Sequence, residues 1–126
     1  MRCAAIAALA RVGLGDEFFT PTARLSAPER ARVLIAAAYA TGAQVLLLDE
    51  PSAGGSAQDR ELLVSLVRSL RDEGLAVLLV EHDLRLVRAV ADSIVVLDAG
   101  TVVAQGPPEA VAADPRVRAI YLGGRT

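Results

Sequence analysis

The sequence contains no lysine, so all 13 of its basic residues are arginines. Any site that depends on a lysine side chain is therefore excluded, including the phosphate-binding loop G-x-x-x-x-G-K-[ST]. Cys3 is the single cysteine, which excludes an internal disulfide and favours a reducing compartment. With 13 basic and 15 acidic residues the formal charge is -2, so charge gives no case for binding nucleic acid.

Aromatic residues and long apolar runs are also scarce. The 126 residues include two Phe, two Tyr and no Trp, although 53% of them are hydrophobic. We therefore expect one domain at most, with a core of small aliphatic side chains, and no segment of the ~18 apolar residues that span a bilayer. The first residues faintly resemble a signal peptide. Because Ile6, Leu9 and Val12 recur at helical spacing, we favour an amphipathic helix over residues 2–12.

The most informative stretch is an apolar run that ends in two carboxylates and a proline, at residues 45–51. Four aliphatic residues without alternation predict a strand that is buried on both faces, as in a parallel sheet. Asp49 and Glu50 then fall at its carboxyl end, where open α/β sheets hold their ligands. Such a pair of carboxylates favours a cation or a proton between them. A strand that simply runs into an acidic, solvated loop is an equally good interpretation.

A second buried strand is predicted over residues 75–80, and it too ends in polar side chains. Between the two strands, residues 57–72 carry leucine and valine on one helical face. This order predicts a βαβ unit with parallel strands. Because the carboxyl ends of parallel strands meet at one edge, we expect His82 to lie close to Asp49 and Glu50. Alternatively, His82 is a surface residue that precedes a helix capped by its neighbour.

The remaining elements are simpler to interpret. Ser26 and Glu29 have the spacing of a capping box, and the free N–H groups of a helix start are suited to binding an anion. Two adjacent phenylalanines, Phe18 and Phe19, are expected to anchor a loop by packing. We further expect a helix over residues 84–91 and a hairpin over residues 94–104. Two short helices are expected after these, one beginning after Gly106 and the other after Asp114.

In this order and at these spacings, the motifs resemble the carboxy-terminal part of an ABC-transporter ATPase subunit. The corresponding family motifs are the signature, Walker B, D-loop and switch-histidine loop, found here at Leu25-Ser26, 45–51, Ser52-Ala53-Gly54 and Glu81-His82-Asp83. The tail, with Val103-Ala104-Gln105-Gly106 and Asp114-Pro115, looks most like the subunits that serve branched-chain amino acid importers. The resemblance covers about residues 5–124.

The resemblance implies an α/β fold that corresponds to the carboxy-terminal half of a RecA-like P-loop NTPase core. A parallel βαβ unit would be followed by a hairpin and flanking helices, and the Walker A strand would be missing. Residues 1–42 would belong to the helical subdomain and residues 43–126 to half of the catalytic core. In this family the missing strand lies between the strand 75–80 and the hairpin 94–104, so both are expected to have unpaired edges.

The resemblance also implies roles in ATP hydrolysis. Asp49 would hold Mg²⁺, through water. Glu50 would orient or polarise the attacking water, and His82 would contact the γ-phosphate of ATP. The signature motif would contact ATP held by the opposite subunit through Ser26, Ala27 and Glu29. The D-loop would lie across the dimer interface at Ser52, Ala53 and Gly54.

Three departures from the family pattern bear on these roles. The usual Leu-Ser-Gly-Gly-Gln is Leu-Ser-Ala-Pro-Glu here, so Pro28 has no N–H to donate and Glu29 brings negative charge toward a phosphate. Gly55-Ser56 stands where the D-loop usually has Leu-Asp or Leu-Asn. The phosphate-binding loop is absent, because its lysine does not exist in this chain.

Two functions fit these observations. The first is an ATP-binding subunit of an ABC transporter for branched-chain amino acids, truncated or split, that hydrolyses ATP only with a separate Walker-A-containing half. Its partners would be a second ATPase subunit and transmembrane permease subunits, at the inner face of the cell membrane. The second is a non-catalytic half-domain that docks on another ATPase subunit as an interaction module. The carboxylates and histidine favour the first, the altered signature favours the second, and a remnant without function is a third interpretation.

Overall fold

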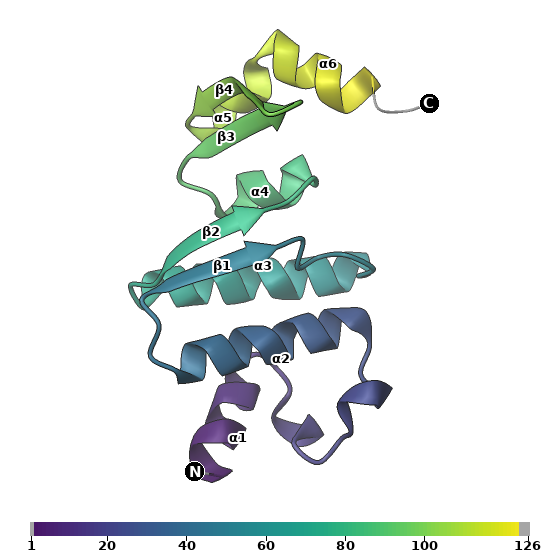
Figure 1. Cartoon of the computed structure of the whole chain (residues 1–126), viewed down its shortest axis with the longest axis vertical. Helices are drawn as coiled ribbons and strands as arrows, with labels where there is room; N and C mark the ends of the chain where they lie inside the picture. The colour runs from purple at the N-terminus through teal and green to yellow at the C-terminus, as the bar shows by residue number, and fades with distance from the viewer. Residues whose placement is uncertain (1, 124–126) are drawn as a thin grey trace. The chain divides into compact units, whose positions relative to one another are not determined.

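The computed structural model describes residues 2–123 and divides into two compact units between His82 and Asp83 (Figure 1). The first unit contains α1 (Arg2–Arg11), the short 3-10 helices η1 (Gly15–Glu17) and η2 (Thr22–Arg24), α2 (Ala27–Ala40), β1 (Val45–Asp49), α3 (Ala57–Asp72) and β2 (Ala76–Val80). The second contains α4 (Leu84–Val90), β3 (Ile94–Asp98), β4 (Thr101–Gly106), α5 (Pro108–Ala113) and α6 (Pro115–Gly123). No helix within residues 2–123 is long and apolar enough to cross a membrane.

The predicted βαβ unit is confirmed in the first unit. Strands β1 and β2 pair in parallel, with Leu47 opposite Leu78, and α3 connects them. α3 begins in a second capping box, in which Ser56 Oγ accepts from the Asp59 N–H (3.1 Å) and the Asp59 carboxylate accepts from the Ser56 N–H (2.9 Å). Its buried side chains, each contributing roughly 1.5–3 kcal/mol, are Leu63, Leu66, Val67 and Leu70.

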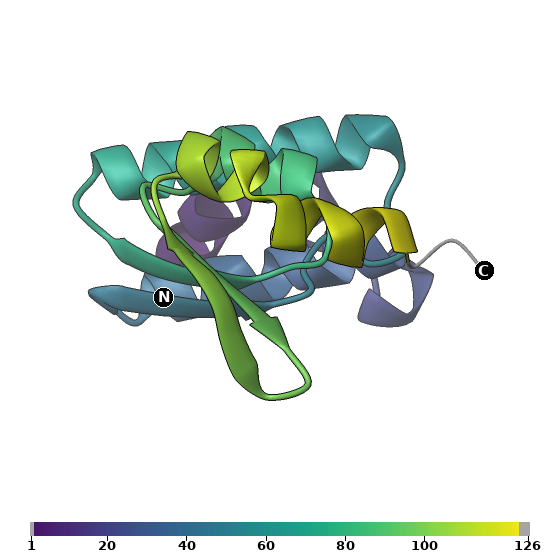
Figure 2. The ribbon, with the colours of Figure 1, turned by 90° about the horizontal axis from the view of Figure 1, so that it is seen from above.

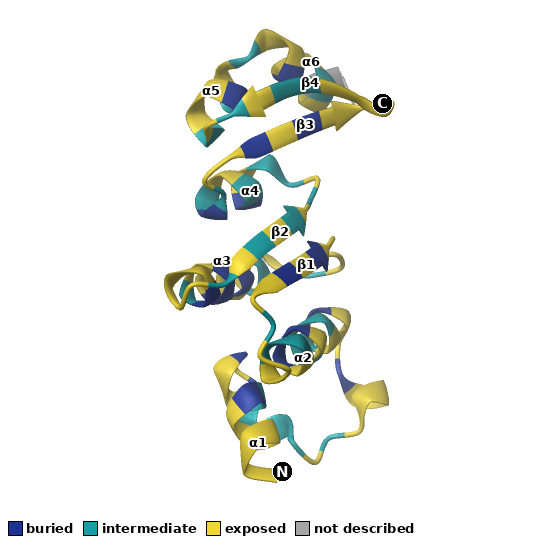
Figure 3. Cartoon of the chain, turned by 60° about the vertical axis from the view of Figure 1, so that its left-hand side comes forward, coloured by how far each residue is buried: buried dark blue, intermediate teal, exposed yellow. Residues whose placement is uncertain are grey.

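The prediction that both strands are buried on both faces is wrong. β1 alternates, with Leu46 and Leu48 buried while Leu47 is 71% exposed (Figure 3). On β2, Leu78 and Val80 are exposed as well. An apolar run without alternation is typical of a strand that is covered on both faces. Within the described residues, α3 covers one face of this sheet (Figure 1) and the other face is exposed.

Helices α1 and α2 pack together in the first unit, and a polar cluster joins them to the end of α3. Arg11 forms an ion pair with Glu73 and donates to Ser69 Oγ (3.1 Å), and the Tyr39 hydroxyl donates to Glu73 (2.8 Å). The loop after α1 departs from expectation at one residue. Phe19 is 84% exposed, so it does not anchor the loop by packing.

The second unit is built around the predicted hairpin, which is confirmed. Strands β3 and β4 pair antiparallel and form the green hairpin of Figure 2. Their register shifts between Val96 and Leu97, which marks a bulge. Ala99 and Gly100 occupy the turn with φ of 45° and 78°, the double positive φ of a type I′ turn. The core of this unit consists of Ile94, Val96, Val111 and Val117, which α5 and α6 share with β3. Each of the two sheets in residues 2–123 has only two strands, in agreement with the expected unpaired edges.

Candidate functional site

The site begins where β1 ends. Asp49 is the last residue of the strand, and it lies on the same exposed face of the sheet as Leu47. Glu50 follows in the left-handed region with φ of 45°, its N–H donating to Val80 O (2.9 Å) and its C=O accepting from the Ala53 N–H (3.1 Å). A non-glycine residue in this region costs roughly 1–2 kcal/mol, and such strain tends to occur at functional sites.

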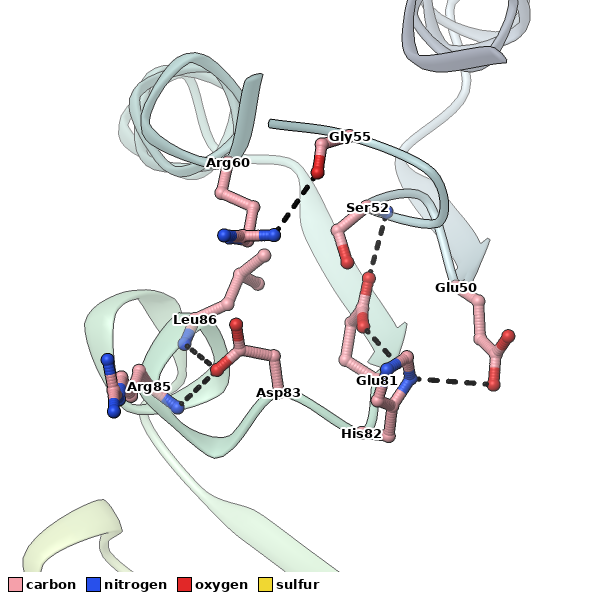
Figure 4. Close-up of polar contacts among 9 residues, drawn as sticks. All are labelled: Glu50, Ser52, Gly55, Arg60, Glu81, His82, Asp83, Arg85 and Leu86. Atoms are coloured by element: carbon pink, nitrogen blue, oxygen red, sulfur yellow. Dashed lines mark hydrogen bonds and ion pairs between the residues drawn. The ribbon is translucent and has the colours of Figure 1, made fainter. Parts of the chain in front are cut away.

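The carboxyl end of β2 supplies the second half of the site. The His82 ring is 75% exposed, and its Nδ1 lies 3.8 Å from Glu50 Oε1 and 3.8 Å from Glu81 Oε2 (Figure 4). These distances are longer than a hydrogen bond but within the range of an ion pair when the ring is protonated. The structure thus brings Glu50 and His82 together, at the same sheet edge as Asp49, as the βαβ pattern predicts.

Sequence reasoning placed Glu81, the residue between β2 and the histidine, at the polar end of the second strand but gave it no role. Its side chain is fully buried, and Oε1 accepts a hydrogen bond from the backbone N–H of Ser52 (2.9 Å), as Figure 4 shows. This contact joins the end of β2 to the loop that follows β1. Strand alternation was the available signal, because it places Glu81 on the same face as the half-buried Val77 and Leu79.

For the predicted Mg²⁺, the structure offers an exposed carboxylate, that of Asp49. Within residues 2–123, no group of three or more His, Cys, Asp or Glu side chains is arranged to hold a metal ion. Mg²⁺ is commonly held by one or two carboxylates, with phosphate oxygens and water completing its shell. The exposed carboxylate of Asp49, at the carboxyl end of β1, is able to supply such a ligand.

At the start of α2 the chain's own carboxylate occupies the predicted anion site. The Ser26 N–H and hydroxyl both donate to Glu29 Oε2, at 2.7 and 2.8 Å, and the Glu29 N–H donates to Ser26 Oγ at 3.3 Å. These hydrogen bonds from Ser26 lower the pKa of Glu29. The predicted capping box is therefore confirmed, and any contact of Ser26, Ala27 or Glu29 with ATP stays a prediction.

The loop predicted as a D-loop packs against this helix start within the same chain. A Cβ added to Gly55 would lie 3.1 Å from Ser52 O and 3.5 Å from Pro28 Cγ, and one added to Gly54 would lie 3.8 Å from Ala27 Cβ. Arg60 also donates to Gly55 O (3.2 Å, Figure 4). A larger residue would have to displace backbone at Gly55, which explains why glycine stands there. A role for Ser52, Ala53 and Gly54 across a dimer interface stays a prediction.

Comparisons with known proteins bear directly on this fold and site. A family described as "ABC transporter" matches residues 1–53, and one described as "Branched-chain amino acid ATP-binding cassette transporter" matches residues 101–125. Among solved structures, the ADP conformation of MJ1267, an ATP-binding cassette of an ABC transporter, has a TM-score of 0.84 at 28% identity, covering 94% of this chain and 48% of that one. CbiO1 from Clostridium perfringens, part of the ABC transporter complex cbiONQ, has a TM-score of 0.79 at 29% identity, covering 98% of this chain and 49% of that one.

Curated relatives are similar over most of this chain. The hemin import ATP-binding protein HmuV of Rhodococcus jostii is 43% identical over 110 residues, 87% of this chain and 37% of its own length. The zinc import ATP-binding protein ZnuC of Alkalilimnicola ehrlichii is 39% identical over 115 residues, 90% of this chain and 44% of its own. The branched-chain amino acid transport ATP-binding protein LivG of Escherichia coli K12 is 35% identical over 116 residues, 91% of this chain and 46% of its own.

The fold is that of part of a P-loop NTPase core. Within that class, the chain belongs to the ABC-transporter ATPase family, and it corresponds to the carboxy-terminal part of the ATPase domain. It spans less than half the length of each of these three curated relatives.

Proposed function

We propose that this chain provides the catalytic carboxylate and the γ-phosphate-sensing histidine of an ATPase that drives import by an ABC transporter. The observation that carries the proposal is the approach of Glu50 and His82, 3.8 Å apart at the carboxyl edge of the β1–β2 sheet. ATP and Mg²⁺ are the cofactors of this function. In this role Asp49 would hold Mg²⁺, Glu50 would polarise the attacking water, and His82 would contact the γ-phosphate, so the chemistry would be mainly positioning and charge stabilisation.

This function requires a phosphate-binding loop, and the 126 residues contain no lysine to form one. We therefore propose that a half carrying this loop, in the same polypeptide or on a separate chain, covers the bare face of the β1–β2 sheet. The exposed side chains of that face are all apolar apart from Asp49, and they include Val45, Leu47, Leu78 and Val80. Such a face is stabilised when apolar side chains from the strands or helices of a partner half pack against it.

The proposed cargo is branched-chain amino acids. The match of residues 101–125 to the branched-chain family supports this assignment, as does the similarity to LivG. The hemin and zinc import proteins are 43% and 39% identical over 110 and 115 residues, more than LivG at 35% over 116, so the assignment of the cargo depends mainly on the match of the tail. In this role the partners are a second ATPase subunit and transmembrane permease subunits, which would hold the protein at the inner face of the cell membrane.

The test is binding and hydrolysis of Mg-ATP by the purified chain, alone and with the phosphate-loop half of LivG added. We expect binding and turnover only in the mixture. Replacing the catalytic carboxylate by Glu50→Gln should lower turnover by about 10²–10⁴-fold, as expected for loss of a general base. The matched control is Glu61→Gln, the same change at an exposed position of α3. Tight ATP binding by the chain alone, or turnover that survives Glu50→Gln, would refute the proposal.

One observation favours a second function, a non-catalytic interaction module. Glu29 occupies the helix start at which the family binds ATP held by the opposite subunit, so this chain is poorly suited to that contact. As a module it would dock on a complete ATPase subunit and add no nucleotide site. Stable association with such a subunit, with the number of ATP molecules bound per complex unchanged, would favour this function.

A further inference from the structure

Glu81 has a buried carboxylate oxygen whose presence neither the fold nor the proposed chemistry explains. Within residues 2–123, its Oε2 is the buried side-chain polar atom that has no hydrogen-bond partner. Removing a carboxylate oxygen from water without replacing its hydrogen bonds is unfavourable. Leucine or valine would fill this covered position without that cost, so the groups nearest to Oε2 indicate what the carboxylate does there.

The nearest polar group is the His82 ring. The Ser52 N–H holds one oxygen of the Glu81 carboxylate at 2.9 Å and thereby fixes the direction of the other. That second oxygen lies 3.8 Å from Nδ1 of His82, and Glu50 Oε1 lies 3.8 Å from the same nitrogen (Figure 4). The two carboxylates differ in freedom, because the Glu81 side chain is fully buried whereas that of Glu50 is 56% exposed.

An imidazole nitrogen between two acceptors is the one that carries the proton. The hydrogen bond made by one ring nitrogen decides the tautomer and leaves the other nitrogen for a ligand. A shift of the exposed ring by about 1 Å would bring Nδ1 and Glu81 Oε2 to hydrogen-bond distance. Because Glu81 is held by packing and by Ser52, it is the member of the pair able to fix the ring.

We propose that Glu81 is a positioning residue that keeps His82 in the Nδ1–H tautomer, so that Nε2 is the nitrogen presented to a ligand. The inference rests on the proposed function, in which that ligand is the γ-phosphate of ATP. It adds that a single buried carboxylate links the loop after β1, through the Ser52 N–H, to the orientation of the histidine ring. Movement of Ser52 would therefore be transmitted to the ring through Glu81.

The test is the tautomer of His82, read by two-bond ¹H–¹⁵N correlation NMR on the ¹⁵N-labelled chain. His82 is the only histidine, so the spectrum reports one ring. In alkaline buffer, where the ring carries a single proton, we expect that proton on Nδ1. In Glu81→Gln the side-chain amide can still accept from Ser52 but can donate to Nδ1, so we expect the proton to move to Nε2. Glu61→Gln, the same change on exposed α3, should keep the wild-type pattern.

Two results would overturn the proposal. A proton on Nε2 in the wild-type chain would do so without any variant, so the test stands even where Glu81→Gln fails to fold. Reversal of the tautomer in Glu50→Gln but not in Glu81→Gln would show that Glu50, and not Glu81, orients the His82 ring. An unchanged Ser52 amide resonance in Glu81→Gln would show that the loop contact survives. No nucleotide is added, so failure here leaves the proposed ATPase function untouched, and failure to bind ATP leaves the tautomer result standing.

Discussion

At the scale of single residues, Glu50 combines a proposed catalytic role with a strained backbone. Its φ of 45° is unfavourable for a glutamate, whereas asparagine adopts this region more readily. We predict that Glu50→Asn raises the free energy of unfolding by roughly 0.5–1 kcal/mol while abolishing ATP turnover in the mixture described above. Glu50→Gln is the control, since it removes the charge without relieving the backbone. Urea denaturation of both variants checks this, and equal stability would show that the strain is not relieved.

Acid sensitivity is also set by single residues, most clearly in the second unit. Hydrogen bonds from the Arg116 side chain and backbone N–H lower the pKa of Asp114 to about 2. Because the folded pKa lies below the unfolded value near 3.8, this group stabilises the fold above about pH 4, and that contribution is lost as the pH falls through about 2.

We therefore predict that Asp114→Asn flattens the loss of stability between about pH 4 and about pH 2. Asparagine still caps the start of α6, so the substitution isolates the charge from the cap. The measurement is urea denaturation at several pH values, with Asp16→Asn, an exposed site in the first unit, as the control. An acid transition as steep as that of the wild type would contradict the assignment to Asp114.

At the scale of elements, the hairpin turn offers a clean test of local geometry. Ala99 has a φ of 45° at the first central position of the type I′ turn, where Asn-Gly is the preferred pair. Ala99→Asn should therefore stabilise the second unit by about 0.5 kcal/mol, and Ala99→Val, which is β-branched, should destabilise it by about 1 kcal/mol or more. Thermal unfolding followed by circular dichroism measures both changes. A valine variant more stable than the asparagine variant would show that the turn adopts another type.

Elements were also what the sequence predicted best. The helix over 57–72 and the hairpin follow from local signals, namely period, caps and turn residues, and the structure has them at nearly the same bounds. The exposure of Leu47 and Leu78 could not be predicted, because an apolar run reports what covers a strand in the complete fold. Strand alternation marks Glu81 as covered, but its hydrogen-bond partner could not be predicted. Its partner, the Ser52 N–H, is 29 residues away, and no local pattern identifies such a contact.

At the scale of the whole molecule, the bare face of the β1–β2 sheet is the dominant feature of the first unit. Leu47 and Leu78 are directly opposite each other across the strand pair, and they are 71% and 60% exposed. Adjacent exposed leucines on a sheet are typical of an interface or of an aggregation site. If this face receives the phosphate-loop half, covering each leucine contributes roughly 1–2 kcal/mol to the association.

We predict that Leu47→Gln and Leu78→Gln each weaken binding of the phosphate-loop half by about tenfold, since 1.4 kcal/mol corresponds to a factor of ten. Both positions are exposed in the isolated chain, so its fold and circular dichroism spectrum should be retained. The matched control is Leu34→Gln on α2, where leucine is also 71% exposed but belongs to a helix and not to the sheet. Calorimetric titration of the half into each variant gives the Kd. Equal weakening by Leu34→Gln, or full binding by the sheet variants, would mean that the partner half covers a different surface, and the proposed function would then need another explanation for these exposed leucines.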